Sequence, residues 1–176
     1  MNFSAPSWDL FVALFLIVSI GYGFLMQRER IIVTMVAAYV GLVFAILFTP
    51  QVFGFFHGTN PLLGKFFIRA NLDITQIQIG LFLLTTILVS TKAGLDAERS
   101  RGWLTPFELV LTSALTGILI AGAIIGFLPE TTRLGLATGS KFVAYLVHYH
   151  DLAILAPIAF LVVLGLRDGL THRPRL

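Results

Sequence analysis

Glu108 is the clearest candidate for chemistry in this sequence, because it lies inside the long apolar segment 103–128. At the rise of an α-helix, its carboxyl group sits roughly 7–8 Å below the end of that segment. A charged side chain is costly to hold in a membrane, so Glu108 can be a proton or cation ligand that faces a bundle interior. It can equally be structural, since the helix dipole stabilises a carboxylate in the first turns and Arg99 or Arg101 is within reach. Both interpretations stay open.

A second group of candidates is the run His148-Tyr149-His150-Asp151. On one helix His148 and Asp151 would share a face at i and i+3, whereas His150 would not lie on the face of His148. A His–Asp pair can be half of a metal site, or a proton-linked pair because histidine titrates near neutrality. It can also belong to the belt of aromatic and polar side chains at a membrane interface. Zinc signatures, with two histidines four apart or paired cysteines, do not occur, so we predict no metal site.

Polar residues recur in the apolar segment 74–91. Gln78 and Thr85 are seven residues apart and therefore share one face of a helix. We predict that this face points into the bundle. There it either forms interhelical hydrogen bonds or lines a polar path together with Glu108 and the His148–Asp151 pair.

The sequence carries no recognisable catalytic constellation. No set of residues fills the nucleophile, base and stabiliser roles together. The absence of cysteine excludes disulfides, thiolate metal sites and cysteine nucleophiles. An enzyme that acts on lipid would need a metal or an acid–base pair. We therefore predict that the protein is not an enzyme and has no cofactor.

The composition indicates that lipid surrounds most of the chain. Of 176 residues, 57% are hydrophobic and only 12% are charged, whereas soluble domains carry about 25% charged residues. So little charge cannot cover a surface that faces water. The net charge of +3 does not indicate nucleic-acid binding, because the basic residues flank apolar segments.

Apolar segments of about 20 residues are long enough to cross a membrane as helices. We predict one all-α domain, residues 1–176, built as an integral membrane bundle of about five transmembrane helices. Four spans plus a re-entrant hairpin are the alternative. The predicted spans are 8–26, 31–49, 74–91, 103–128 and 145–166.

The segment after the second span predicts a short amphipathic helix at 61–72. Asn60 is a good N-cap and Pro61 suits the first helical position. Leucine and phenylalanine side chains then fall on one side, and Lys65 and Arg69 on another, as in helices that lie among lipid headgroups. A re-entrant segment that borders a cavity is the alternative. The segment 129–140 is predicted to be the other connection on this side of the membrane.

The distribution of Lys and Arg predicts the orientation, since these residues favour cytoplasmic loops. With the N-terminus outside, eight of the 12 Lys and Arg residues lie on the inner side and four on the outer side. The inner residues are Arg28, Arg30, Lys92, Arg99, Arg101, Arg167, Arg173 and Arg175, and the outer ones are Lys65, Arg69, Arg133 and Lys141. We predict an outside N-terminus, a cytoplasmic C-terminus and a retained first span, because no basic region precedes that span.

Small residues predict where helices pack, because in lipid they let backbones approach. The span 31–49 carries a ridge of them at four-residue spacing, and the span 103–128 carries two. We predict that these two spans make the closest contact, and that the GxxxG pattern in 103–128 serves either this chain or a dimer. Pro157 is predicted to free a carbonyl near Ala153. The ridge residues are Ala37, Gly41 and Ala45, then Ser113, Gly117 and Ala121, then Gly122 and Gly126.

The opening of the chain resembles the colicin V production protein family. The likeness is carried by Trp8-Asp9, Gly21-Tyr22-Gly23-Phe24 and Arg28-Glu29-Arg30, and the stretch Gly117 to Gly126 is similar to that family's glycine-rich fourth span. The chain departs from the family pattern at Ser100-Arg101-Gly102, where the family has an Asp-Arg pair, and in its fifth span. The resemblance implies a bacterial inner-membrane protein with a role in envelope maintenance or secretion, and no catalytic residues.

Two functions follow as predictions. The first is an accessory or structural membrane subunit that packs, within the lipid bilayer, against other membrane subunits or copies of itself. The second is a channel or transporter protomer whose path is lined by Glu108, Gln78 and the His148–Asp151 pair.

Overall fold

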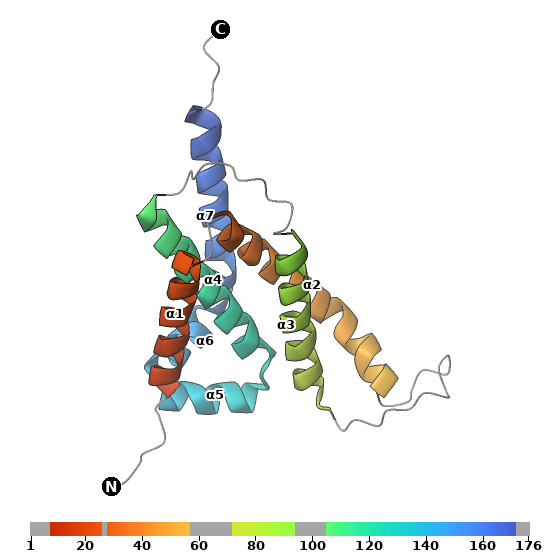
Figure 1. The fold of residues 1–176 in the computed structure, drawn as a ribbon. Helices are drawn as coiled ribbons and strands as arrows, with labels where there is room; N and C mark the ends of the chain where they lie inside the picture. Colours follow the sequence, from red (N-terminus) through yellow and green to blue (C-terminus); the bar gives the residue numbers. More distant parts are fainter. Residues whose placement is uncertain (1–7, 26–27, 57–71, 94–104, 172–176) are drawn as a thin grey trace.

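The computed structural model describes residues 8–25, 28–56, 72–93 and 105–171 (Figure 1). The predicted interfacial helix 61–72 lies, apart from its last residue, outside the described residues, as do Arg99 and Arg101. The described part contains seven helices and no strand, so the predicted all-α fold is confirmed. The helices are α1 (Trp8–Leu25), α2 (Arg28–Phe56), α3 (Ile74–Ala93), α4 (Pro106–Phe127), α5 (Glu130–Gly139), α6 (Lys141–His148) and α7 (His150–Thr171).

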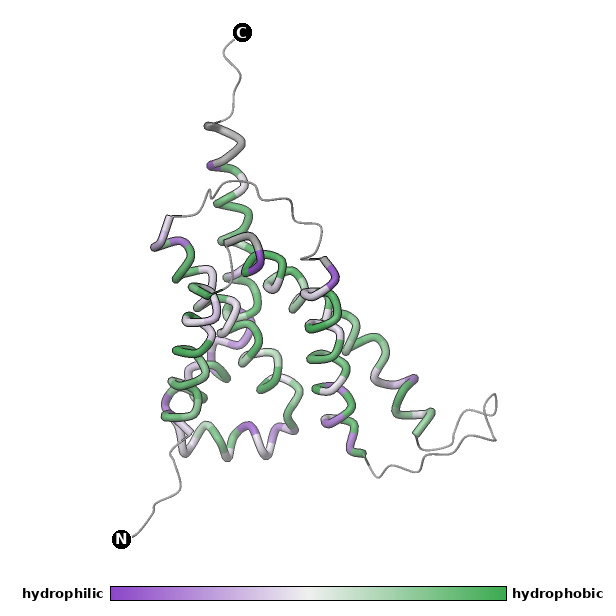
Figure 2. The backbone as a smooth tube through the Cα atoms, in the orientation of Figure 1, coloured by the Kyte–Doolittle hydropathy of each residue, from purple (hydrophilic) through white to green (hydrophobic). Residues whose placement is uncertain are grey.

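Five of these helices are long and apolar enough to cross a membrane, namely α1, α2, α3, α4 and α7. Successive spans run in opposite directions, and α5 lies across the end of the bundle where α1 begins (Figure 1). Most of the span surface is hydrophobic, while α5 and the helix ends carry the polar residues (Figure 2). The chain is a multi-pass membrane protein.

Three predicted boundaries need correction. The segment 129–140 is mostly helical, since α5 fills it from Glu130 onward, and the backbone carbonyl of Pro129 accepts from Arg133 N at 2.9 Å. The second span does not end before Pro50, because α2 continues through this proline to Phe56. At 29 residues, α2 is about 43 Å long, and it crosses the bundle at a tilt (Figure 1).

The predicted fifth span, 145–166, is interrupted at Tyr149. This residue leaves the helical conformation, with φ −108° and ψ 31°, and ends α6. Its N–H donates back to Tyr145 O at 2.9 Å, while its carbonyl accepts from Ala153 N at 2.8 Å and so begins α7. His148 and Asp151 therefore lie on two different helices, and the prediction that they share one helical face is wrong.

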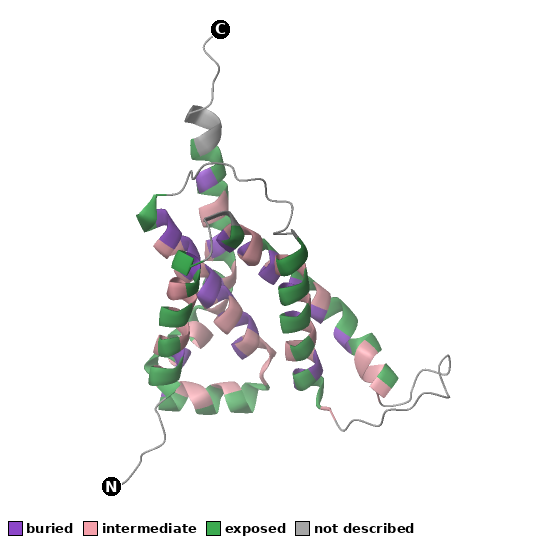
Figure 3. Ribbon diagram, viewed as in Figure 1, coloured by how far each residue is buried: buried purple, intermediate pink, exposed green. Residues whose placement is uncertain are grey.

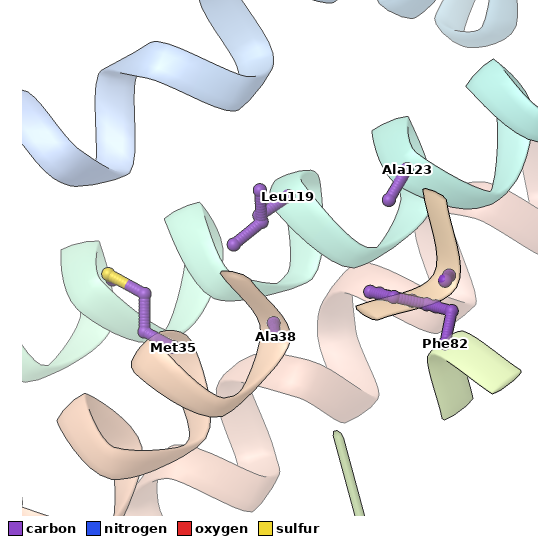
Figure 4. Packing of buried hydrophobic residues seen from close by; sticks show 6 residues of the cluster. Met35, Ala38, Phe82, Leu119 and Ala123 are labelled. Atoms are coloured by element: carbon purple, nitrogen blue, oxygen red, sulfur yellow. The ribbon is translucent and has the colours of Figure 1, made fainter. Parts of the chain in front are cut away.

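The core of the bundle lies where α2, α3 and α4 meet. Figure 4 shows its apolar centre, with Met35 and Ala38 from α2, Phe82 from α3, and Leu119 and Ala123 from α4. All five are almost fully buried. Helix α4 is the most enclosed span, whereas α1 and α3 present mostly exposed surface (Figure 3). An exposed apolar surface of this kind is what a lipid environment requires.

The ridge of α2 is used as predicted for close packing, but against a different helix. Ala37 and Ala45 are completely buried. A Cβ atom at Gly41 would collide with the Thr86 side chain and lie 2.9 Å from the backbone oxygen of Phe82, both on α3. Helix α2 packs most extensively on α3, so the prediction that spans two and four make the closest contact is wrong for contacts within one chain, and its alternative, a contact between copies, stays a prediction. Glycine spacing shows that a helix can be approached closely, but not by which neighbour.

The first ridge of α4 packs against α1 in a reciprocal way. Gly23 of α1 lies on the Ser113 side chain, and a Cβ at Gly117 would lie 2.7 Å from Ser19 Oγ. Ser19 Oγ also donates to the carbonyl of Ser113 at 3.0 Å. Each helix thus places a glycine against the serine of the other, which allows the two antiparallel backbones to approach.

The second ridge of α4, the GxxxG pair, also packs within the chain. A Cβ at Gly122 would lie 3.5 Å from Ala153 Cβ, and one at Gly126 would overlap the ring of His150, both in α7. Of the two alternatives for this pattern, the structure therefore shows intramolecular packing.

Candidate functional site

The carboxylate of Glu108 holds together the start of α4 and the end of α7. Thr105 is the N-cap of α4 and Pro106 takes the first helical position. Thr105 N donates to Glu108 Oε2 at 2.7 Å, and Glu108 N donates to Thr105 Oγ1 at 3.3 Å, which is a complete capping box. The other carboxylate oxygen pairs with the guanidinium of Arg167. Only 11% of the Glu108 side chain is exposed. We call this cluster of Thr105, Glu108 and Arg167 the paired end.

The polar residues that follow Glu108 on α4 bond to their own helix. Thr112, Ser113 and Thr116 are all buried. Each hydroxyl donates to the carbonyl four residues earlier, at 2.7 Å, 2.7 Å and 2.8 Å respectively. The hydrogen bonds of these buried hydroxyls are therefore formed inside α4. Their protons are not available to a chain of ions or water molecules passing through the bundle.

Gln78 and Thr85 lie at the flank of the α3 face that meets α2. Both are half-buried, and neither side chain forms a hydrogen bond with another described residue. The fully buried positions of this face are Phe82 and Thr86, and the Thr86 hydroxyl donates to Phe82 O at 2.7 Å. Van der Waals packing dominates the face on which Gln78 and Thr85 were predicted to lie.

The residues of the predicted polar path are not brought together. Arg167, the partner of Glu108, lies 16 residues after Asp151 on α7, which corresponds to about 24 Å along a helix. Glu108 thus occupies one end of the bundle and the His148–Asp151 segment the other (Figure 1).

At this other end, polar side chains from α5, α6 and α7 surround a recess of about 520 Å³. Arg133 of α5 lines it, and its Nε is buried with no hydrogen-bond partner among the described residues. His150 Nδ1 lies 3.4 Å from Asp151 Oδ1, and the Asp151 side chain is 98% exposed. We call this site the α5–α7 recess. Its lining residues are Arg133, Val147, His148, Tyr149, His150, Asp151, Leu152 and Leu155.

Aromatic rings and the α4 backbone hold the lining of the α5–α7 recess in place. The ring of Tyr149 stacks on Tyr145 at 6.5 Å between centroids and meets His148 edge-on at 4.7 Å. His150 lies over Gly126, where only glycine leaves room for the imidazole. Within the described residues, no three His, Cys, Asp or Glu side chains are grouped as metal ligands would be.

A second hollow, next to the α5–α7 recess, is lined almost entirely by apolar side chains. It measures about 360 Å³ and lies between α1, α4, α5 and α6. Trp8, Phe11 and Leu136 are among its lining residues. Helix α5 therefore lines both an apolar hollow and a polar one.

Two long-range hydrogen-bonded contacts were missed by sequence reasoning. Asp9 lies in the first turn of α1, and its Oδ1 accepts from Ser140 Oγ at 2.6 Å and from Phe142 N at 3.1 Å at the start of α6. Tyr39 Oη donates to the Ile154 carbonyl at 2.5 Å, three residues before Pro157 and next to the carbonyl that was predicted to be freed. Serine before an apolar helical run signals an N-cap, but no local pattern reveals a partner so distant in the chain.

No family model, curated protein or solved structure matches this chain. The resemblance to the colicin V production protein family accordingly stays a prediction.

Proposed function

We propose that this protein is an accessory or structural subunit of a membrane assembly. In this proposal it lies in the bacterial inner membrane, with the N-terminus outside and the C-terminus in the cytoplasm. The observation that carries the proposal is the closed interior: the buried polar groups of α4 are bonded within the chain, and the ionisable groups lie at opposite ends. A bundle of this kind is suited to binding through its outer surface.

The closed interior favours this function over a channel. A conducting path needs polar groups that can exchange partners along its whole length. Thr112 and Thr116 donate to their own backbone, and Glu108 is held in a capping box and an ion pair. In liposomes we expect no ion flux, or a flux that Glu108→Gln and His148→Ala both leave unchanged. Flux that either substitution abolishes would contradict the accessory function.

An open glycine on α3 supports a docking position for a partner helix. Gly80 is exposed, and a Cβ atom at this position would meet nothing within 4 Å. Gly21 of α1 and Gly165 of α7 are open in the same way, whereas Gly23, Gly41 and Gly117 are covered by neighbouring helices. Leu84 continues the same exposed face one turn later. Close approach to a glycine is a common way for transmembrane helices to associate. The partner is another membrane subunit or a second copy of this chain.

The absence of cysteine allows a direct test of this docking position. Cysteine introduced as Gly80→Cys should cross-link in native membranes to a partner or a second copy. Leu14→Cys, on the equally apolar and 57% exposed surface of α1, is the control. We expect a specific adduct from position 80 alone. Equal cross-linking at both positions, or at neither, would argue against α3 as the docking face.

The proposed orientation is supported by the charges at the two ends. Arg28, Arg30, Lys92 and Arg167 lie at the end where α7 finishes, and Arg133 and Lys141 lie at the other. An impermeant maleimide added to intact cells permeabilised only in the outer membrane should label Thr138→Cys in α5 and not Thr91→Cys in α3. The reverse labelling pattern would overturn the orientation.

A further inference from the structure

The α5–α7 recess combines features that the accessory function does not explain. It lies at the end of the bundle that α5 crosses (Figure 1), beside the first residues of span α7. Because a span begins at a membrane interface, we expect this end of the bundle to lie near lipid headgroups. Arg133 contributes a guanidinium whose Nε is buried and has no partner among the described residues. A buried donor without a partner is costly, and an anion bound in the recess beside this guanidinium would offset part of that cost electrostatically.

The lining carries both signs of charge in separate places. Arg133 supplies the cation from α5, while Asp151 supplies a carboxylate on α7 that is 98% exposed. The imidazoles of His148 and His150 lie between them in the sequence and add further hydrogen-bonding nitrogens. A ligand with one anionic and one cationic group therefore matches the lining better than a simple anion, which the carboxylate would repel.

We propose that the α5–α7 recess binds the headgroup of a phosphoethanolamine lipid. Arg133 binds the phosphate, because a guanidinium offers donors in a fork that matches phosphate oxygens. Asp151 accepts from the primary ammonium, which carries three N–H donors. A choline headgroup has no such donors, and a glycerol headgroup has no cation, so both fit the pair less well.

The membrane itself is the source of this ligand. The recess is open, and α5 beside it has no buried residue, as in a helix that lies at an interface. Helix α5 also lines the apolar hollow, so the same helix offers hydrocarbon-lined space as well. A lipid headgroup is present there at high local concentration, which allows even a modest affinity to give occupancy.

The test is competitive lipid retention by the whole protein. Nanodiscs containing phosphatidylethanolamine, phosphatidylglycerol and phosphatidylcholine in equal molar amounts are extracted with mild detergent, and the retained lipids are measured by native mass spectrometry. We expect the wild type to retain phosphatidylethanolamine preferentially. Arg133→Gln should lower this retention about tenfold, and Asp151→Asn should reduce the preference for ethanolamine over choline.

Matched controls separate the site from general charge effects. Lys92→Gln removes an exposed cation from the opposite end, and Glu130→Gln removes an exposed carboxylate from α5 outside the recess. Both should retain lipid as the wild type does. Arg133→Lys keeps the charge without the fork and should give intermediate retention, and circular dichroism with size-exclusion chromatography shows that each variant is folded.

Several outcomes would overturn the proposal. They are wild-type retention of all three lipids in equal amounts, a folded Arg133→Gln protein with unchanged retention, and an equal loss in Lys92→Gln. A last experiment uses inorganic phosphate to distinguish a lipid headgroup from free phosphate. If it raises the melting temperature of delipidated protein as much as phosphatidylethanolamine does, and Arg133→Gln removes both effects, the ligand is a free phosphate and not a lipid.

Discussion

The two ends of this bundle treat charge in opposite ways. At the paired end, Glu108 accepts from the backbone of Thr105 and pairs with Arg167, so the carboxylate is bonded on both of its oxygens. At the α5–α7 recess, Arg133 leaves its Nε without a described partner and Asp151 is almost completely exposed. A carboxylate and a guanidinium therefore pair with each other at one end. At the other end, no ion pair joins Arg133 and Asp151 within the described residues, and Asp151 lies 3.4 Å from His150 Nδ1 instead.

This contrast separates a structural role from a binding role. A carboxylate that caps a helix and meets a guanidinium has few free lone pairs for a ligand. Groups that remain unpaired in a membrane protein are costly unless something from outside satisfies them. We therefore expect substitutions at the paired end to change stability, and substitutions at the recess to change lipid retention.

The largest effect on stability is expected from Gly23→Ala, near the paired end. The new Cβ would overlap the Ser113 side chain, so α1 and α4 must separate. Overpacking of this kind costs about 1–3 kcal/mol in the free energy of unfolding. Gly21→Ala is the matched control, because nothing lies within 4 Å of its Cβ position. Denaturation in mixed micelles measures the free energy of unfolding of both variants. An equal loss of stability in the two would show that the reciprocal Gly–Ser contact does not stabilise the packing of α1 on α4.

Glu108→Ala should have the next largest effect on stability. It removes one half of the capping box and leaves Arg167 without this carboxylate. Loss of a helix cap costs about 1 kcal/mol, and the half-exposed Arg167 contributes little more. Glu108→Gln should be milder, since an amide can still accept from Thr105 N. Thermal unfolding in detergent checks this order, and an equal loss in the two variants would show that the charge of Glu108, and not its capping hydrogen bond, provides the stability.

Gly126→Ala should affect the recess more than the fold. Its Cβ would meet the ring of His150, the end of a side chain that can turn away. The unfolding free energy should change by less than about 1 kcal/mol, because no backbone has to move. Phosphatidylethanolamine retention, in contrast, should fall, since His150 lines the recess. Unchanged lipid retention together with a large loss of stability would contradict the proposal that the recess binds lipid and does not stabilise the fold.

The sequence predicted the spans because long apolar segments have only one favourable environment. It did not predict the break at Tyr149, since no glycine or proline stands within residues 141–156 to signal the end of a helix there. The sequence predicted the structural role of Glu108 as one of two interpretations, because a carboxylate in the first turn of a helix can be recognised from the local sequence. The position of Arg133 in the recess was not predicted, since it depends on how α5, α6 and α7 come together around the recess, and no local pattern encodes that arrangement.

The smallest effect is expected beside the apolar core, from Tyr39→Phe. The Tyr39 hydroxyl donates to Ile154 O at 2.5 Å, where Pro157 weakens the hydrogen-bond ladder of α7. Interhelical hydrogen bonds in membranes contribute about 0.6 kcal/mol on average, so the loss should be of this size. Tyr145→Phe, on a 66% exposed ring, is the control and should be neutral. A loss well above about 1 kcal/mol, comparable with that of Glu108→Ala, would mean that the centre of the bundle also depends on a polar contact, and that the division into a structural end and a binding end is too simple.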